Sequence, residues 1–236
     1  MRLLTVTLFP YTTLYAQYAM GGDDDKIGSE NKTTADRYAA IGAKWAGGPF
    51  EVGALVDWQN KSNRDVTIGQ NTLPRTVYSI KDAYTVNLAG SYDCGFAKTY
   101  LALQYFKDAN DVAGLIPKAA SIISADAAAQ VMRLLTVTGY GVHLSTAFDA
   151  LGGSWKAGIG YMDGDADLHF ADTKGFNGDV KAYTASVGYE YALSKRTMVY
   201  TGMGYTQREL DMTYDQENSK DTVKGFDFAM GLVHRF

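Results

Sequence analysis

The chain has few residues placed for acid–base chemistry. Three histidines are spread along it, and only His169 lies among carboxylates. Those carboxylates belong to Asp163, Asp165, Asp167 and Asp172, in the stretch DGDADLHFAD. A histidine beside a carboxylate can act as a general base. Acidic surface loops are nevertheless common without catalysis, so we expect that the chain is not an enzyme.

Metal and cofactor sites are also not indicated. Cys94 is the single cysteine, so no disulfide and no cysteine-based metal site can form within the chain. The stretches DGDADLHFAD and GGDDDKIG are acidic, but neither has the spacing of a calcium-binding EF-hand loop. The second stretch would repel a phosphate. We therefore expect no metal and no cofactor.

The composition favours a β-rich protein. The 236 residues include 17 Tyr and 25 Gly but only 4 Pro, and 46% of the residues are hydrophobic. Aromatic residues are enriched in strands. The net charge of −4 argues against a nucleic-acid partner, which would require a basic surface.

Residues alternate between apolar and polar along much of the chain. In FEVGALVDW, Phe50, Val52, Val56 and Trp58 fall on one face, and Glu51 falls on the other. The same period of two is found in YTVNLAGSY, SWKAGIGYM, YTASVGYEY and the final GFDFAMGLVHRF, and less cleanly at 11–20, 38–46, 96–106, 134–148 and 196–207. This alternation predicts about ten β-strands.

The connections between these strands alternate between long and short. AGGP, DCG, DALGG and LSKR are short, and the segments between them, including 209–222, are long and polar. One long connection contains a possible helical stretch at 118–131. An antiparallel up-and-down sheet with its long loops at one end produces this pattern, whereas Greek-key sandwiches mix the lengths. We predict an all-β, up-and-down β-barrel with no domain boundary within 11–236.

Aromatic residues at both ends of the apolar faces indicate that these faces meet lipid. Several pairs lie eight residues apart, which corresponds to roughly 26 Å along a strand. Transmembrane barrels carry such aromatic girdles at both edges of an apolar band of about 25 Å. The predicted girdle comprises Phe50, Trp58, Tyr84, Tyr92, Tyr140, Phe148, Trp155, Tyr161, Tyr183 and Tyr191. No stretch is apolar enough for a transmembrane helix, so a transmembrane β-barrel is the prediction.

The opposite strand faces carry the charges. In a membrane barrel they line the interior, where rings of charge bias ion passage. The predicted pore-lining charges are Lys44, Glu51, Asp57, Lys98, Lys156, Glu190, Arg196, Asp227 and Arg235. A second interpretation, that each charge only keeps the interior wet, stays open.

Two segments resemble a known family. YEYALSKRTMVYTGMGYTQ at 189–207 and the terminal FDFAMGLVHRF are similar to the last hairpin and last strand of the general (non-specific) porins of the Gram-negative outer membrane, in their beta-proteobacterial branch. GSYDCGFAKTYLALQYFKD resembles a mid-barrel hairpin of that family. The resemblance implies a sixteen-stranded trimeric barrel for passive diffusion of ions and small hydrophilic solutes. It also implies contact with outer-membrane lipid and lipopolysaccharide, and assembly machinery that reads the terminal strand through Phe236, His234, Leu232 and Met230.

The resemblance implies in addition that about six leading strands are missing, and with them the constriction loop. We therefore expect a carboxyl-terminal porin fragment, or else a smaller closed barrel. Two other functions stay open. One is a non-conducting anchor or adhesin whose interior is blocked by the loop 107–132. The other, less favoured, is a protease at the rim that uses His169.

The first seven residues, MRLLTVT, recur at 132–138. The two copies are followed by different sequences, and we place them at opposite ends of the barrel, which argues against a structural repeat. We expect residues 1–10 to be a leader or artefact foreign to the barrel and to lie outside the sheet.

Overall fold

The computed structural model describes residues 2–9, 11–19, 37–60, 66–68, 71–73, 81–109, 135–168, 177–214 and 217–235. Four expectations lie wholly or largely outside these ranges: the possible helix at 118–131, the loop 107–132 as a block of the interior, a site at His169 and Asp172, and the terminal Phe236. Within the described ranges, no helix has the length and apolar character needed to cross a membrane.

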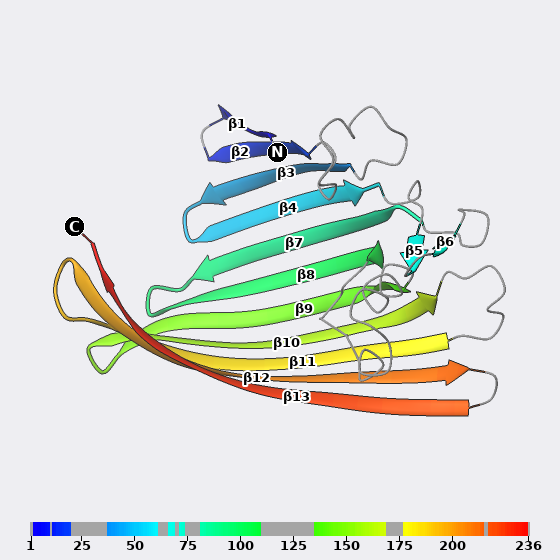
Figure 1. The fold of residues 1–236 in the computed structure, drawn as a ribbon. Helices are drawn as coiled ribbons and strands as arrows, with labels where there is room; N and C mark the ends of the chain where they lie inside the picture. The colour runs from blue at the N-terminus through cyan, green and yellow to red at the C-terminus, as the bar shows by residue number, and fades with distance from the viewer. Residues whose placement is uncertain are drawn as a thin grey trace.

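The molecule is built around one antiparallel sheet of eleven strands that follow one another in chain order (Figure 1). The strands are β1 (Arg2–Phe9), β2 (Thr12–Ala19), β3 (Tyr38–Gly47), β4 (Phe50–Gln59), β7 (Ala83–Asp93), β8 (Ala97–Ala109), β9 (Leu135–Ala150), β10 (Gly153–Leu168), β11 (Asn177–Ala192), β12 (Thr197–Tyr214) and β13 (Glu217–His234). The sheet curves strongly, and its two edges are β1 and β13. The predicted all-β, up-and-down architecture is confirmed, and each of the ten predicted strands is present.

β1 is an eleventh strand that was not predicted. It pairs antiparallel with β2, from Arg2 opposite Tyr18 to Phe9 opposite Thr12. The expectation that residues 1–10 lie outside the sheet is therefore wrong for Arg2–Phe9, because a run rich in Leu, Val and Thr pairs readily with a neighbouring strand. The described part of the second MRLLTVT copy, residues 135–138, begins β9, which runs in the same direction as β1 because six antiparallel steps separate the two strands. The expectation that the copies lie at opposite ends of the barrel is therefore wrong for the described residues.

The short connections after β3, β7, β9 and β11 gather at one end of the sheet (the short-turn end; Figure 1). The opposite end, where β2, β4, β8 and β10 finish, is called the long-loop end. The turn between β9 and β10 has Leu151 at φ 56° and Gly152 at φ 78°. Two successive residues with positive φ are typical of the type I′ turn, whose twist matches the flanking strands. The turn after β3 also uses a glycine with positive φ, Gly48 at 57°.

Several strands extend beyond their predicted ends at the long-loop end. The stretch 209–222 was predicted to be a loop, but β12 and β13 stay paired up to Tyr214 opposite Glu217. The prediction is wrong there because backbone pairing continues where the contrast between apolar and polar faces has ended. The connection after β4 contains a small hairpin that was also not predicted, formed by β5 (Val66–Ile68) and β6 (Asn71–Leu73).

The buried core is small and lies near the long-loop end. It consists of Phe106, Val137, Ala166, Val180 and Leu210, each at most 4% exposed. Alternation places these residues on the strand face that carries the charges, which was predicted to line the pore. This apolar cluster was missed because its residues lie at the strand ends, where the alternation is weak.

Candidate functional site

The apolar strand faces form one continuous surface across the sheet. The register joins Gly90 to Leu101, Leu101 to Leu144, and Leu144 to Ile159, and the row continues through Ala185 and Tyr205 to Phe226. Its large members are exposed, with Leu144 at 45% and Ile159 at 60%. In a water-soluble barrel these residues would form the interior. A large exposed apolar surface indicates contact with another apolar phase, as expected for a lipid-facing wall.

Aromatic rings form two rows along this apolar face. Near the short turns, the rings of Phe50 and Tyr92 are 4.7 Å apart, and Phe148 pairs with Trp155. Tyr191 lies in the same row. Nearer the long loops, Tyr161 lies 6.4 Å from Tyr140 and 5.3 Å from Tyr183, and Trp58 pairs with Tyr84. The structure therefore brings together the ten residues of the predicted girdle in two groups.

Tyr189 is a further member of the short-turn row. Its ring lies 4.8 Å from that of Trp155, and its hydroxyl donates a hydrogen bond of 2.9 Å to the Leu151 carbonyl. The sequence places Tyr189 on the apolar face, but inside the alternating run and not at its end, where the predicted girdle residues lie. A search for aromatic residues opposite one another on neighbouring strands would have found it.

Replacing Tyr161 tests the long-loop row. Tyr161→Ala removes two ring contacts, and each aromatic pair contributes about 0.5–1.5 kcal/mol. We expect the free energy of unfolding to fall by about 1–3 kcal/mol in urea titrations of the refolded protein, followed by tryptophan fluorescence. Tyr161→Phe is the control: it keeps the ring and loses only the 2.9 Å hydrogen bond to Asp163. Equal losses in both variants would contradict a role for the ring.

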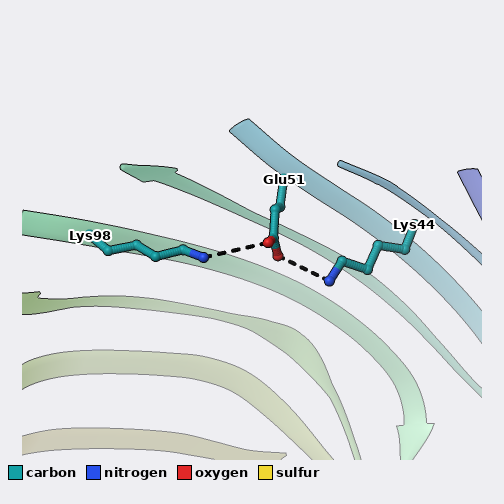
Figure 2. A network of polar contacts seen from close by, with 3 residues as sticks. All are labelled: Lys44, Glu51 and Lys98. Atoms are coloured by element: carbon teal, nitrogen blue, oxygen red, sulfur yellow. Dashed lines mark hydrogen bonds and ion pairs between the residues drawn. The ribbon is translucent and has the colours of Figure 1, made fainter. Parts of the chain in front are cut away.

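The opposite, polar face carries a network of three charges (Figure 2). Glu51 on β4 lies between Lys44 on β3 and Lys98 on β8. Its two carboxylate oxygens are 3.0 Å from Lys44 Nζ and 3.5 Å from Lys98 Nζ. The contact with Lys98 passes over β7, which separates β4 from β8. Ion pairs this exposed contribute about 0–1 kcal/mol to stability, so the network matters mainly through its charge.

The other predicted charges are placed separately. Lys156 on β10 pairs with Glu190 on β11 at 2.5 Å. Asp57 lies on β4 and Asp227 on β13. Arg196 lies in the turn between β11 and β12, and the backbone N–H of Arg235 donates to its carbonyl at 2.8 Å. These two arginines thus lie beyond the strand ends, at the short-turn end.

A hollow of ≈ 720 Å³ lies beside these charges. Tyr100, His143, Lys156 and Asp227 contribute to its lining, together with small residues of β10 to β13. The ring of His143 lies over Gly158 and Gly160, where a Cβ atom would meet the imidazole. The polar side chains in this lining can bind water and small solutes.

No metal site is found in the part of the chain that the structure describes, where no three His, Cys, Asp or Glu side chains gather. Asp163, Asp165 and Asp167 lie along β10. Asp163 accepts a hydrogen bond of 2.9 Å from the Tyr161 hydroxyl, and His169 lies outside the described residues.

These two faces, one apolar with girdles and one charged, agree with the comparison to known proteins. The family model for Gram-negative porins matches residues 9–210. The chain belongs to the Gram-negative porin family. The predicted family and the predicted location in the Gram-negative outer membrane are thereby confirmed.

An outer membrane porin protein of Bordetella pertussis is 29% identical to this porin over 97% of the chain, and the match covers 54% of that protein. The chain thus spans about half the length of the curated relative. Among solved structures, OmpT of Vibrio cholerae matches 98% of the chain with a TM-score of 0.58 at 14% identity, and the match covers 63% of that structure. The outer membrane channel DcaP of Acinetobacter baumannii matches 98% with a TM-score of 0.53 at 12% identity, covering 61%. Both support the fold.

The last strand of this porin presents its predicted assembly residues on the lipid side. Met230 and Leu232 are 74% and 60% exposed. His234 follows on the same face, and its Nδ1 lies 2.8 Å from Thr197 Oγ1. The fourth residue, Phe236, lies outside the described part of the chain.

Proposed function

We propose that the chain forms the wall of a water-filled channel for passive diffusion of ions and small hydrophilic solutes. The observation that carries this proposal is the division of one sheet into an exposed apolar face and a charged face. Charges such as Lys44, Glu51 and Lys98 keep the interior wet and act on passing ions. Diffusion through such a channel needs no cofactor and no covalent step, and we propose no enzymatic role.

The proposed partners of the chain follow from the same division of the sheet into an apolar face and a charged face. Outer-membrane lipid would cover the apolar rows, and lipopolysaccharide would meet the girdle at the outer edge. The exposed residues Met230, Leu232 and His234, with Phe236, would be read by the barrel assembly machinery. Family resemblance supports a homotrimer. These partners are part of the proposal.

Conductance measurements test the channel. The full chain, refolded and reconstituted into planar bilayers, is expected to give stepwise currents that are ohmic and rise with salt concentration, because ions cross a wet interior. Heat-denatured protein serves as the control and should give no steps. Folded protein that inserts but never conducts would contradict the proposal.

A second candidate is a non-conducting barrel that serves as an anchor or adhesin. The observation in its favour is the buried apolar cluster on the polar face, in which Val180 and Ala166 are 0% exposed. A dry region of that kind narrows the interior near the long loops. Liposome swelling in small sugars separates the two: swelling supports the channel, and its absence with inserted protein supports the anchor.

A further inference from the structure

Glu51 has a special position among the charges of the polar face. In the described part of the chain it is the one carboxylate that contacts two lysines, at 3.0 Å and 3.5 Å. Glu190 contacts Lys156 alone. Asp93 lies opposite Lys98 in the register, but it accepts a hydrogen bond of 2.9 Å from the Gly95 N–H in the turn. Glu51 is thus the main counter-charge for both lysines.

The network is open to the interior, and a buried polar group lies beside it. The side chains of Lys44, Lys98 and Glu51 are 46%, 32% and 39% exposed, so passing ions can approach them. Ser91 lies opposite Glu51 on β7 and is 9% exposed, and its hydroxyl has no hydrogen-bond partner in the structure. Two ammonium groups and a hydroxyl without a hydrogen-bond partner can together bind a small anion. In this structure the Glu51 carboxylate occupies the position between the two lysines.

We propose that Glu51 determines the charge selectivity of the channel, acting as a tethered counter-ion that keeps Lys44 and Lys98 from holding passing anions. The inference rests on the proposed channel function. With Glu51 ionised, the three side chains carry one net positive charge; without it, they carry two. The anions concerned are small and strongly accepting, such as chloride, inorganic phosphate or a carboxylate solute.

The test compares two variants that each remove one negative charge. The zero-current potential of the full chain is measured in planar bilayers under a tenfold KCl gradient. Glu51→Gln is expected to raise the chloride-over-potassium permeability ratio by roughly three- to tenfold, because two lysines lose their counter-charge. Glu190→Gln frees one lysine and should shift the ratio by less than half as much. Equal shifts, or none in Glu51→Gln, would overturn the inference.

Inorganic phosphate is the second probe. Added at millimolar concentration, it should reduce the KCl conductance of Glu51→Gln more than that of the unmodified chain, because the freed lysines and Ser91 can hold it. A variant in which only packing had changed would show no such difference. No extra block by phosphate would count against the proposed anion site.

Two further variants keep the test decisive if Glu51→Gln does not fold. Lys44→Gln and Lys98→Gln each remove a positive charge next to Glu51 and should shift the permeability ratio toward potassium. Unchanged ratios in both would overturn the inference. A conducting wild-type channel with unchanged variants overturns only the role of Glu51, whereas a wild-type chain that never conducts overturns the channel function and this inference together.

Discussion

Leu144→Arg is expected to prevent stable insertion of the barrel. Leu144 lies midway between the two aromatic rows, opposite Leu101 on one side and Ile159 on the other. Its side chain is 45% exposed and faces the lipid. An arginine at this depth costs about 2–4 kcal/mol. The folded fraction in lipid vesicles, read from gel mobility with and without heating, should fall at least tenfold at intermediate urea.

The neighbouring residue provides the matched control. Ser145 lies on the same strand but on the polar face, where the register places it opposite Tyr100 and Gly158. Ser145→Arg places the same group in the wet interior, so we expect its free energy of unfolding to stay within about 1 kcal/mol of wild type. If both variants fold equally well, or both fail, the assignment of the two faces is wrong.

Gly139→Ala is expected to separate β9 from β10 locally. A Cβ atom at this position would overlap the backbone carbonyl of Asp163 and the Cα of Gly164 on the neighbouring strand. Backbone atoms cannot swing aside as the end of a side chain can, so the strands must shift. Such overpacking costs about 1–3 kcal/mol. We expect a lower midpoint of urea unfolding with an unchanged slope.

Gly225→Ala is the control for this substitution. Gly225 also lies within a strand, β13, but a Cβ atom there meets no atom within 4 Å. Alanine lowers the entropy of the unfolded chain relative to glycine, so the midpoint should stay equal or rise slightly. A comparable loss at Gly225 would show that the effect at Gly139 comes from removing a glycine and not from the close approach of β10.

The strand centres and their faces could be predicted because the alternation is local. Phe50 to Trp58 shows its period of two without any knowledge of its neighbours, and the lipid enforces it over the full height of the apolar band. The two aromatic rows were predictable for the same reason, since rings such as Tyr183 and Tyr191 mark the two ends of one apolar stretch within β11.

The strand ends and the contacts across the sheet could not be predicted in this way. Beyond the girdle, charged residues such as Asp211 and Lys220 take positions on the strand face that is apolar between the two aromatic rows, so alternation no longer marks a strand although pairing continues. The contact of Glu51 with Lys98 joins residues 47 positions apart and depends on the register of β7 between them. The buried Phe106 and Leu210 belong to one cluster only because the registers of β9, β10 and β11 align the strands between them.

The long hairpin of β12 and β13 limits which peptide bonds a protease in the surrounding medium can cleave. Trypsin cleaves after lysine and arginine, but it needs a stretch of free backbone that it can draw into its cleft. Lys220 is 61% exposed at its side chain, yet its backbone is paired with Asp211 in the ladder, and Arg208 is paired between β11 and β13. The hairpin can therefore present charged side chains to the medium while withholding the peptide bonds beside them from digestion.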